Sequence, residues 1–202
     1  MAGLAAAIAG FGLGSIPFGY LLVRLAGRGD VRSFGSGNIG ATNVARVLGP
    51  AGWLVTLLGD AGKGWIAVAL AQHFAPTWEL DNDAVTAVAL VVFLGHVWPV
   101  FLRFKGGKGV ATATGVVFGL NPWTGLLAIV TWIIVAAIGR ISSLSALMAA
   151  VLTPVYAWIF LGSEANTLVI LVMSLLLIWR HKSNIANLIP GKEARIGGSD
   201  TP

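Results

Sequence analysis

Three polar segments interrupt an otherwise apolar sequence, and the first of them, residues 33–46, carries side chains suited to binding an oxyanion. It contains three Gly, two Ser, two Asn, one Thr and one Arg. Glycine lets backbone N–H groups approach a ligand closely, Ser, Asn and Thr add neutral hydrogen bonds, and Arg supplies a forked cation. Few of these residues favour helix. The composition leaves two interpretations open, a ligand-binding loop and a flexible connection.

The second segment, residues 103–112, interleaves three Gly with two Lys and leads directly into an apolar run. Exposed N–H groups, the positive end of a helix and compact cations are what a phosphate-binding nest requires. The spacing does not fit the nucleotide-binding P-loop G-x-x-x-x-G-K-[ST], so ATP is not indicated. An ordinary basic loop needs no glycines, and the pattern therefore favours phosphate binding.

The third segment, residues 180–187, follows the last apolar run and is again basic. Alone, it fits a helix end that faces anionic headgroups. Taken together, the segments offer Arg46, Lys105 and Lys108, with Arg180 or Lys182, beside hydroxyl, amide and imidazole groups. Such a set suits one or two phosphates at a membrane surface.

One charged pair interrupts an apolar run, Asp60 and Lys63 at an i, i+3 spacing. Two such residues can pair on one helical face, and ionisable residues at membrane depth are candidates for function. Structural and substrate-positioning roles both remain open for them. Carboxylates are few and scattered in the segments expected on the cytoplasmic side of the membrane, so the sequence predicts no metal centre. No Ser-His-Asp triad can be proposed either.

The elements that position these groups follow from composition. The chain has 202 residues, 56% hydrophobic and 10% charged, with a net charge of +5 and no Cys; its mean hydropathy is +0.85. A soluble domain carries about 25% charged residues, so this chain is expected to be an integral membrane protein. Nucleic-acid binding is not expected, and the absence of Cys excludes disulfides, thiolate metal sites and a cysteine nucleophile.

Apolar runs of about 20 residues favour an all-α bundle, because lipid offers backbone groups no partner. The first run lacks a basic leading segment and is read as a retained span rather than a signal peptide. We expect seven spans, the fourth too short to cross the bilayer upright and separated from the fifth by a tight turn at Asn121-Pro122. The predicted spans are about 3–23, 51–74, 84–102, 110–120, 122–139, 141–161 and 165–180.

The positions of the basic residues set the expected orientation. Twelve of the thirteen Lys and Arg fall in four clusters, within 24–46, 103–108, at 140 and within 180–195. Because cytoplasmic loops are enriched in Lys and Arg, seven crossings place the N-terminus outside and the C-terminus in the cytoplasm. We expect a single domain over 1–202, with a flexible tail at about 193–202.

The polar motifs, in their order, resemble those of the bacterial acyl-phosphate:glycerol-3-phosphate acyltransferase family (PlsY). The resemblance runs from the first span to near the C-terminus and depends on five motifs. They are Ser36-Gly37-Asn38-x-Gly40-x-Thr42-Asn43-x-x-Arg46, Asp60-x-x-Lys63-Gly64, His96-x-x-Pro99, Phe104-Lys105-Gly106-Gly107-Lys108-Gly109-Val110-Ala111-Thr112 and His181-x-x-Asn184-Ile185.

The resemblance implies a multi-pass enzyme of the bacterial inner membrane with its site on the cytoplasmic side. Its expected reaction moves a fatty acyl group from acyl phosphate to the 1-hydroxyl of glycerol 3-phosphate. The products would be phosphate and lysophosphatidic acid, the first intermediate of phospholipid synthesis. No cofactor is expected, and contact with the enzyme that makes acyl phosphate is a further expectation.

By the same resemblance, the first motif and Lys105, with His181 and Asn184, would hold glycerol phosphate, and the segment from Gly106 to Thr112 would hold the donor phosphate. The residues expected to be catalytic are Ser36, Arg46, Lys105 and His181. Those expected to bind substrate are Asn38, Thr42, Asn43, Lys63, His96, Gly106, Gly107, Lys108, Gly109, Thr112 and Asn184. The sequence departs from the family at Asn187, where a basic residue is expected.

Alternatives remain at two levels. For the mechanism, direct attack is favoured over a Ser36 acyl-enzyme, and the proton passes either to His181 or to a substrate phosphate oxygen. For the function, a transporter of an organophosphate would use similar cations but place them near mid-membrane. A structural protein that binds anionic lipid would leave the glycine pattern unexplained.

Overall fold

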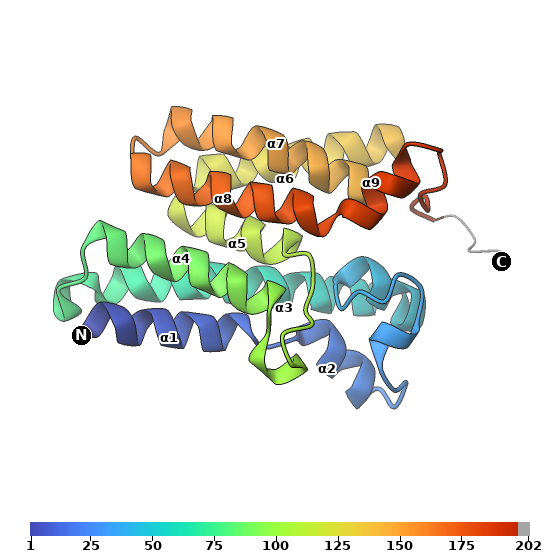
Figure 1. The fold of residues 1–202 in the computed structure, drawn as a ribbon, viewed down its shortest axis with the longest axis horizontal. Coiled ribbons are helices and arrows are strands. Elements are labelled where there is room, and N and C mark those ends of the chain that lie inside the picture. Colours follow the sequence, from blue (N-terminus) through green and yellow to red (C-terminus); the bar gives the residue numbers. More distant parts are fainter. Residues whose placement is uncertain (198–202) are drawn as a thin grey trace. The chain divides into compact units, whose positions relative to one another are not determined.

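The computed structural model describes residues 1–197, and within them every regular element is a helix (Figure 1). The prediction of an all-α membrane protein is confirmed. The helices divide by their contacts into two compact units, Met1–Leu120 and Asn121–Pro202. The expected single domain is not decided by this division and stays a prediction. Of the expected tail at 193–202, residues 198–202 lie outside the described residues.

The first unit contains α1 (Ala2–Gly14), α2 (Phe18–Leu25), α3 (Ala41–Trp78), α4 (Asn82–Val97) and α5 (Val110–Leu120), with short 3₁₀ turns η1 (Val31–Ser33) and η2 (Val100–Leu102). Helices α1, α3 and α4 lie side by side (Figure 1), and α5 packs on α3. The second unit contains α6 (Pro122–Gly139), α7 (Ser142–Phe160), α8 (Glu164–Arg180) and α9 (Lys182–Leu188). There α7 packs against both α6 and α8.

The first predicted span, 3–23, differs from the structure because it is two helices, with a bend of 40° between α1 and α2. Pro17 lies in the break. A proline has no N–H and its ring clashes with the preceding turn, so it kinks or breaks a helix. The break leaves the carbonyl of Ile16 to accept a hydrogen bond from the Lys63 ammonium at 2.7 Å.

Helix α3 also differs from expectation, because it begins at Ala41, inside the first polar segment, rather than near residue 51. Its early part ends at Gly49, whose φ of 69° and ψ of −163° are not helical. Glycine accepts this conformation at low cost, and Pro50 then begins the long apolar part of the helix. Thr42, Asn43 and Arg46 therefore lie on a helical turn rather than in a flexible loop.

Close helix packing in the first unit depends on glycine. A Cβ atom on Gly115 of α5 would overlap the carbonyl oxygen of Ala61 on α3, and one on Gly64 of α3 would overlap the carbonyl oxygen of Thr112. Small residues at such contacts let two helix backbones approach each other closely in a membrane. The two glycines thus bring the start of α5 against the part of α3 that carries Asp60 and Lys63.

Four helices within the described residues are long and apolar enough to cross a membrane, or up to six if each of two bent pairs forms one span. The bent pairs are α1 with α2 and α8 with α9, while α5 is a shorter apolar helix. Helices α5 and α6 are separate, and the Asn121 side chain caps α6 by accepting the Thr124 N–H at 2.9 Å. Seven crossings and their orientation stay predictions.

Candidate active site

The first polar segment is folded around one buried side chain, that of Asn43, which is 2% exposed. Its Nδ2 donates to three carbonyl oxygens at 2.8–3.0 Å, and its Oδ1 accepts the N–H of Ser36 at 3.0 Å. The three carbonyls belong to Val31, Phe34 and Asn38. A single carboxamide therefore fixes the path of the backbone from residue 31 to residue 38.

Asn43 also orients Arg46, one helical turn further along α3. Arg46 Nη1 donates to Asn43 Oδ1 at 3.3 Å, and a Cβ atom on Gly35 would lie 2.8 Å from the same Nη1. Gly35 has a φ of 49°, in the left-handed region that favours glycine. Ser36, Thr42 and Arg46 are all exposed. The segment thus presents two hydroxyls and one guanidinium on a frame built by Asn43.

An ion pair between Arg32 and Asp30 lies directly before this segment. Arg32 donates to both carboxylate oxygens of Asp30 at 2.7–3.1 Å, and Asp30 also accepts the Arg32 backbone N–H at the start of η1. The Arg32 hydrogen bonds hold the pKa of the Asp30 carboxyl below its usual value. The reciprocal effect of Asp30 raises the pKa of Arg32. Neither residue was singled out in the sequence, because one Asp near one Arg is common in basic loops.

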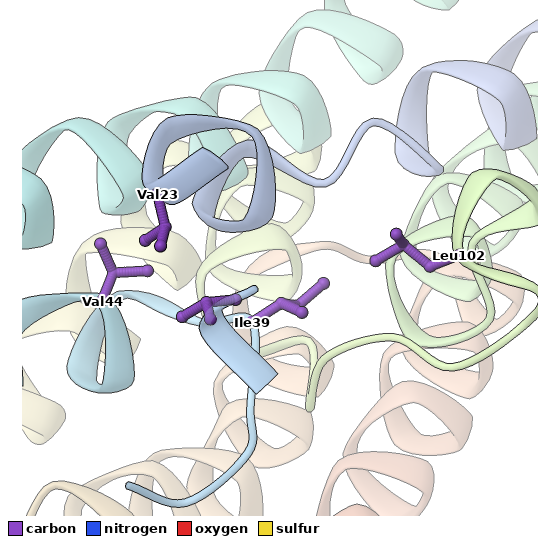
Figure 2. Packing of buried hydrophobic residues seen from close by; sticks show 5 residues of the cluster. Val23, Ile39, Val44 and Leu102 are labelled. Carbon is purple, nitrogen blue, oxygen red and sulfur yellow. The ribbon is translucent and has the colours of Figure 1, made fainter. Parts of the chain in front are cut away.

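A hydrophobic cluster connects the first polar segment to the second (Figure 2). Ile39, from the first segment, packs with Val23 of α2, Val44 of α3 and Leu102 of η2. These side chains are at most 7% exposed. Because Leu102 lies three residues before Lys105, the same cluster anchors both polar segments.

The glycine loop, residues 105–109, lies between η2 and the first residue of α5 and is hydrogen-bonded to the end of α4 and to η2. The N–H of Lys105 donates to Leu102 and the N–H of Gly107 donates to His96, each to a carbonyl oxygen at 3.1 Å. Lys105 is exposed, Lys108 is half-buried and Gly107 is buried. The N–H of Gly107 is therefore used by the fold, while the two lysines of the loop are at least partly exposed.

Beneath this loop lies a buried cluster, formed by Asp60, Lys63 and His96, which we call the charged cluster. Asp60 Oδ1 lies 3.0 Å from Lys63 Nζ and 3.5 Å from His96 Nδ1, and the three side chains are only 1–4% exposed. Lys63 also donates to Ile16, in the break between α1 and α2. The cluster thus joins α3 to α4 and to the α1/α2 break.

Thr112, in the first turn of α5, has a side-chain hydroxyl with no hydrogen-bond partner among residues 1–197. Its residue is fully buried. A buried polar group without a partner costs about 1–3 kcal/mol, so it is an unusual feature of a native fold. Thr112 lies three residues after the glycine loop and is buried, so the phosphate-binding role predicted for it stays a prediction.

The second unit holds the third polar segment. His181, 2% exposed, lies between α8 and α9, and its Nδ1 is 2.8 Å from the carbonyl oxygen of Leu177. A carbonyl only accepts, so Nδ1 carries the proton, and Nε2 is the basic nitrogen of the neutral ring. Asn184 donates to Glu193 Oε1 at 2.6 Å, and Ser143 donates to the same oxygen at 2.8 Å. Sequence reasoning missed Glu193, which stands alone among basic residues.

The predicted site residues thus fall into three groups. Ser36, Asn43 and Arg46 are joined by hydrogen bonds, with Asn38 holding its own turn by accepting the Gly40 N–H. Lys63, His96 and the glycine loop form the second group, and His181 and Asn184 lie in the second unit. Within residues 1–197, no group of three or more His, Cys, Asp or Glu side chains is placed to hold a metal ion.

The amino-acid sequence is similar to those of known proteins over almost its whole length. A family profile described as glycerol-3-phosphate acyltransferase matches residues 4–191. A protein of Nitrosospira multiformis named glycerol-3-phosphate acyltransferase is 61% identical over 189 residues, which cover 94% of both chains. A protein of the same name from Nitrosomonas eutropha is 55% identical and covers 93% of this chain and 94% of the relative.

Two crystal structures are similar over 98% of this chain and 96% of theirs, and both are of PlsY, an integral membrane glycerol 3-phosphate acyltransferase. The glycerol 3-phosphate form is 36% identical, with a TM-score of 0.91. The lysophosphatidic acid form is 35% identical, with a TM-score of 0.88. The resemblance found in the motifs therefore extends over the whole fold.

Proposed function

Since the chain belongs to the glycerol-3-phosphate acyltransferase family, we propose that it transfers an acyl group from acyl phosphate to the 1-hydroxyl of glycerol 3-phosphate. The products are lysophosphatidic acid and inorganic phosphate. The relatives are named for acyl transfer to glycerol 3-phosphate, and two PlsY structures carry that substrate and lysophosphatidic acid in their names. The choice of acyl phosphate as donor comes from the sequence resemblance.

The observation that carries the proposal is the frame around Asn43. It presents the hydroxyl of Ser36 and the guanidinium of Arg46 at an exposed position, where a phosphate ester can reach both. An arginine fork fits a phosphate in two parallel hydrogen bonds. In the proposal, Ser36, Asn38, Thr42 and Arg46 hold glycerol phosphate together with Lys105, while Lys108 contacts a substrate phosphate at the glycine loop. Asn43 supports this set from beneath.

In the reaction, the hydroxyl oxygen of glycerol phosphate forms a bond to the acyl carbonyl carbon, and the bond from that carbon to the phosphate oxygen breaks. The hydroxyl proton passes to His181 or to a substrate phosphate oxygen. Loss of the leaving phosphate needs no further energy source, because an acyl phosphate is a mixed anhydride. The main task of the protein is to align two anions that repel each other, and orientation contributes about 7–11 kcal/mol in favourable cases.

His181 and Asn184 enter the proposal on the sequence resemblance. The hydrogen bond from His181 Nδ1 to Leu177 leaves Nε2 as the basic nitrogen, which suits a general base. Direct transfer is preferred to an acyl-enzyme, because among residues 1–197 no base is hydrogen-bonded to the Ser36 hydroxyl. Trapping of a radiolabelled acyl chain on the protein would contradict direct transfer.

The chain is a multi-pass membrane protein of an integral membrane family. We further propose that it resides in the bacterial inner membrane with its site at the cytoplasmic face, where the basic segments are expected. Contact with the enzyme that makes acyl phosphate belongs to the same proposal. Labelling of single cysteines at Arg46 and Lys108 in intact vesicles tests it, since reaction from opposite faces would rule out a shared site.

The decisive test uses the full chain, purified in detergent, with acyl phosphate and glycerol 3-phosphate but neither nucleotide nor metal. We expect release of phosphate and an equal amount of lysophosphatidic acid, measured by mass spectrometry. Arg46→Ala is expected to abolish most of this activity, whereas Arg28→Ala, an exposed arginine outside the polar motifs, serves as the matched control. Failure of the wild-type protein to form lysophosphatidic acid would overturn the proposal, and transport alone cannot explain product formation in detergent.

A further inference from the structure

The glycine loop lies directly on His96, the penultimate residue of α4. The carbonyl oxygen of His96 accepts the Gly107 N–H, and a Cβ atom on Gly107 would overlap His96 Nε2. A Cβ atom on Gly106 would likewise overlap the His96 carbonyl oxygen and the ring of Pro99. Both glycines are therefore required by the end of α4, on the side of the loop that faces the protein.

The His96 imidazole, which contacts the loop, is itself contacted by Asp60. Its Nδ1 lies 3.5 Å from Asp60 Oδ1, an electrostatic contact rather than a hydrogen bond, and Asp60 lies 3.0 Å from Lys63 Nζ. His96 is 4% exposed. A carboxylate that faces one ring nitrogen of a histidine fixes the orientation of the ring and favours the tautomer that points an N–H at it. Asp60 therefore faces His96 on one side, and Gly107 packs against His96 on the other.

We propose that His96, oriented by Asp60, is a positioning residue that sets the shape of the glycine loop and thereby the directions of Lys105 and Lys108. This role rests on the proposed function, since it concerns how the loop meets a substrate phosphate. It assigns His96 and the charged cluster no contact with substrate. It also gives Asp60, which the motif analysis left open, a defined task.

The first experiment is a double-mutant cycle in the full chain, with Gly107→Ala, His96→Ala and both together. Gly107→Ala forces a methyl group into the imidazole of His96. It is expected to raise the KM for glycerol 3-phosphate or for acyl phosphate far more than it lowers kcat. Removal of the imidazole makes room for that methyl, so the double variant is expected to recover about tenfold in kcat/KM over Gly107→Ala, within the range of coupling between contacting residues. His73→Ala, an exposed histidine on α3, is the matched control and should recover nothing.

The second experiment separates positioning from acid–base chemistry by means of His96→Asn. An Asn side chain can keep a donor facing Asp60 but cannot titrate in the physiological range. Positioning predicts that His96→Asn retains clearly more activity than His96→Ala and keeps the pH profile of the wild type. Equal inactivity of the two variants would overturn the proposal.

Additive effects of Gly107→Ala and His96→Ala, in both kcat/KM and unfolding temperature, would also overturn it. The unfolding temperatures of the same four proteins are measured without substrate. If the wild type forms no lysophosphatidic acid, the proposed function fails. The coupling between Gly107 and His96 can then still be read from unfolding, so the two failures are distinguishable.

Discussion

The side-chain oxygen of Asn43 accepts a hydrogen bond from Arg46 Nη1 at 3.3 Å. The rest of the Asn43 amide is committed to the backbone of residues 31–38. Asn43, which the motif predicted to bind substrate, thus holds in place Ser36 and Arg46, the residues that we propose to contact it. We therefore expect a change at the buried Asn43 to lower stability, and a change at the exposed Arg46 to lower substrate affinity.

Asn43→Asp is expected to disrupt the first polar segment. The new carboxylate cannot donate, and it faces three carbonyl oxygens that the amide nitrogen now satisfies. Loss of buried hydrogen bonds costs about 1–3 kcal/mol for each unsatisfied group, so both unfolding temperature and activity should fall. Asn187→Asp, on the exposed side of α9, is the control for the same chemical change. An Asn43→Asp protein as stable as the wild type would contradict the structural role.

Arg46→Ala should leave stability almost unchanged, because the side chain is exposed. The loss of a charge-assisted hydrogen bond to phosphate, about 1.5–3 kcal/mol, predicts a rise of roughly ten- to hundredfold in the KM for glycerol 3-phosphate. Steady-state kinetics with varied glycerol 3-phosphate measures this. Arg28→Ala should retain the wild-type KM, and an unchanged KM in Arg46→Ala would remove that residue from the site.

Lys63→Met should destabilise the first unit strongly. It leaves the Asp60 carboxylate buried without its closest cation, and breaking a buried ion pair by removing one partner costs about 3–5 kcal/mol. Replacing both residues, as Asp60→Asn with Lys63→Met, should cost much less than the sum of the two single changes. Chemical unfolding in detergent provides the comparison. Additive losses would mean that the pair is not coupled.

Gly115→Ala tests the close packing of α3 and α5. The added methyl would overlap the Ala61 carbonyl oxygen, and overpacking of this kind typically costs about 1–3 kcal/mol. Gly62→Ala is the matched control on α3, since its Cβ would meet nothing within 4 Å. There the gain in helix propensity should make the protein up to about 1 kcal/mol more stable. Unfolding temperatures of the two variants should therefore move in opposite directions.

The sequence predicted the helices well where apolar length alone decides them. The bounds expected for α5 and α6 are those observed, because Asn121 and Pro122 form a helix start that can be recognised locally. The break at Pro17 was not expected, because membrane helices often contain proline without breaking. The structure shows the break through the carbonyl of Ile16, which is free to accept a hydrogen bond from Lys63.

The sequence predicted which residues belong to the candidate site, but not which of them are buried and structural and which are exposed. Asn43 and Arg46 have equally suitable side chains, and only the folded segment reveals that one is buried by the backbone it holds. His96 and Gly107 are eleven positions apart, so their contact depends on the path of the chain through η2. Glu193 could be recognised only once Ser143 and Asn184 were placed beside it.

The bond from Lys63 to Ile16 has a consequence for biogenesis. Residues 1–25 leave the ribosome before α3 does, and on its own helix the Lys63 ammonium is paired with Asp60. Its backbone acceptor lies on the earlier segment, so the two segments reach their lowest energy only side by side. An N-terminal truncation that removes α1 and the break is therefore expected to yield a chain that membrane proteases degrade, rather than a shortened enzyme.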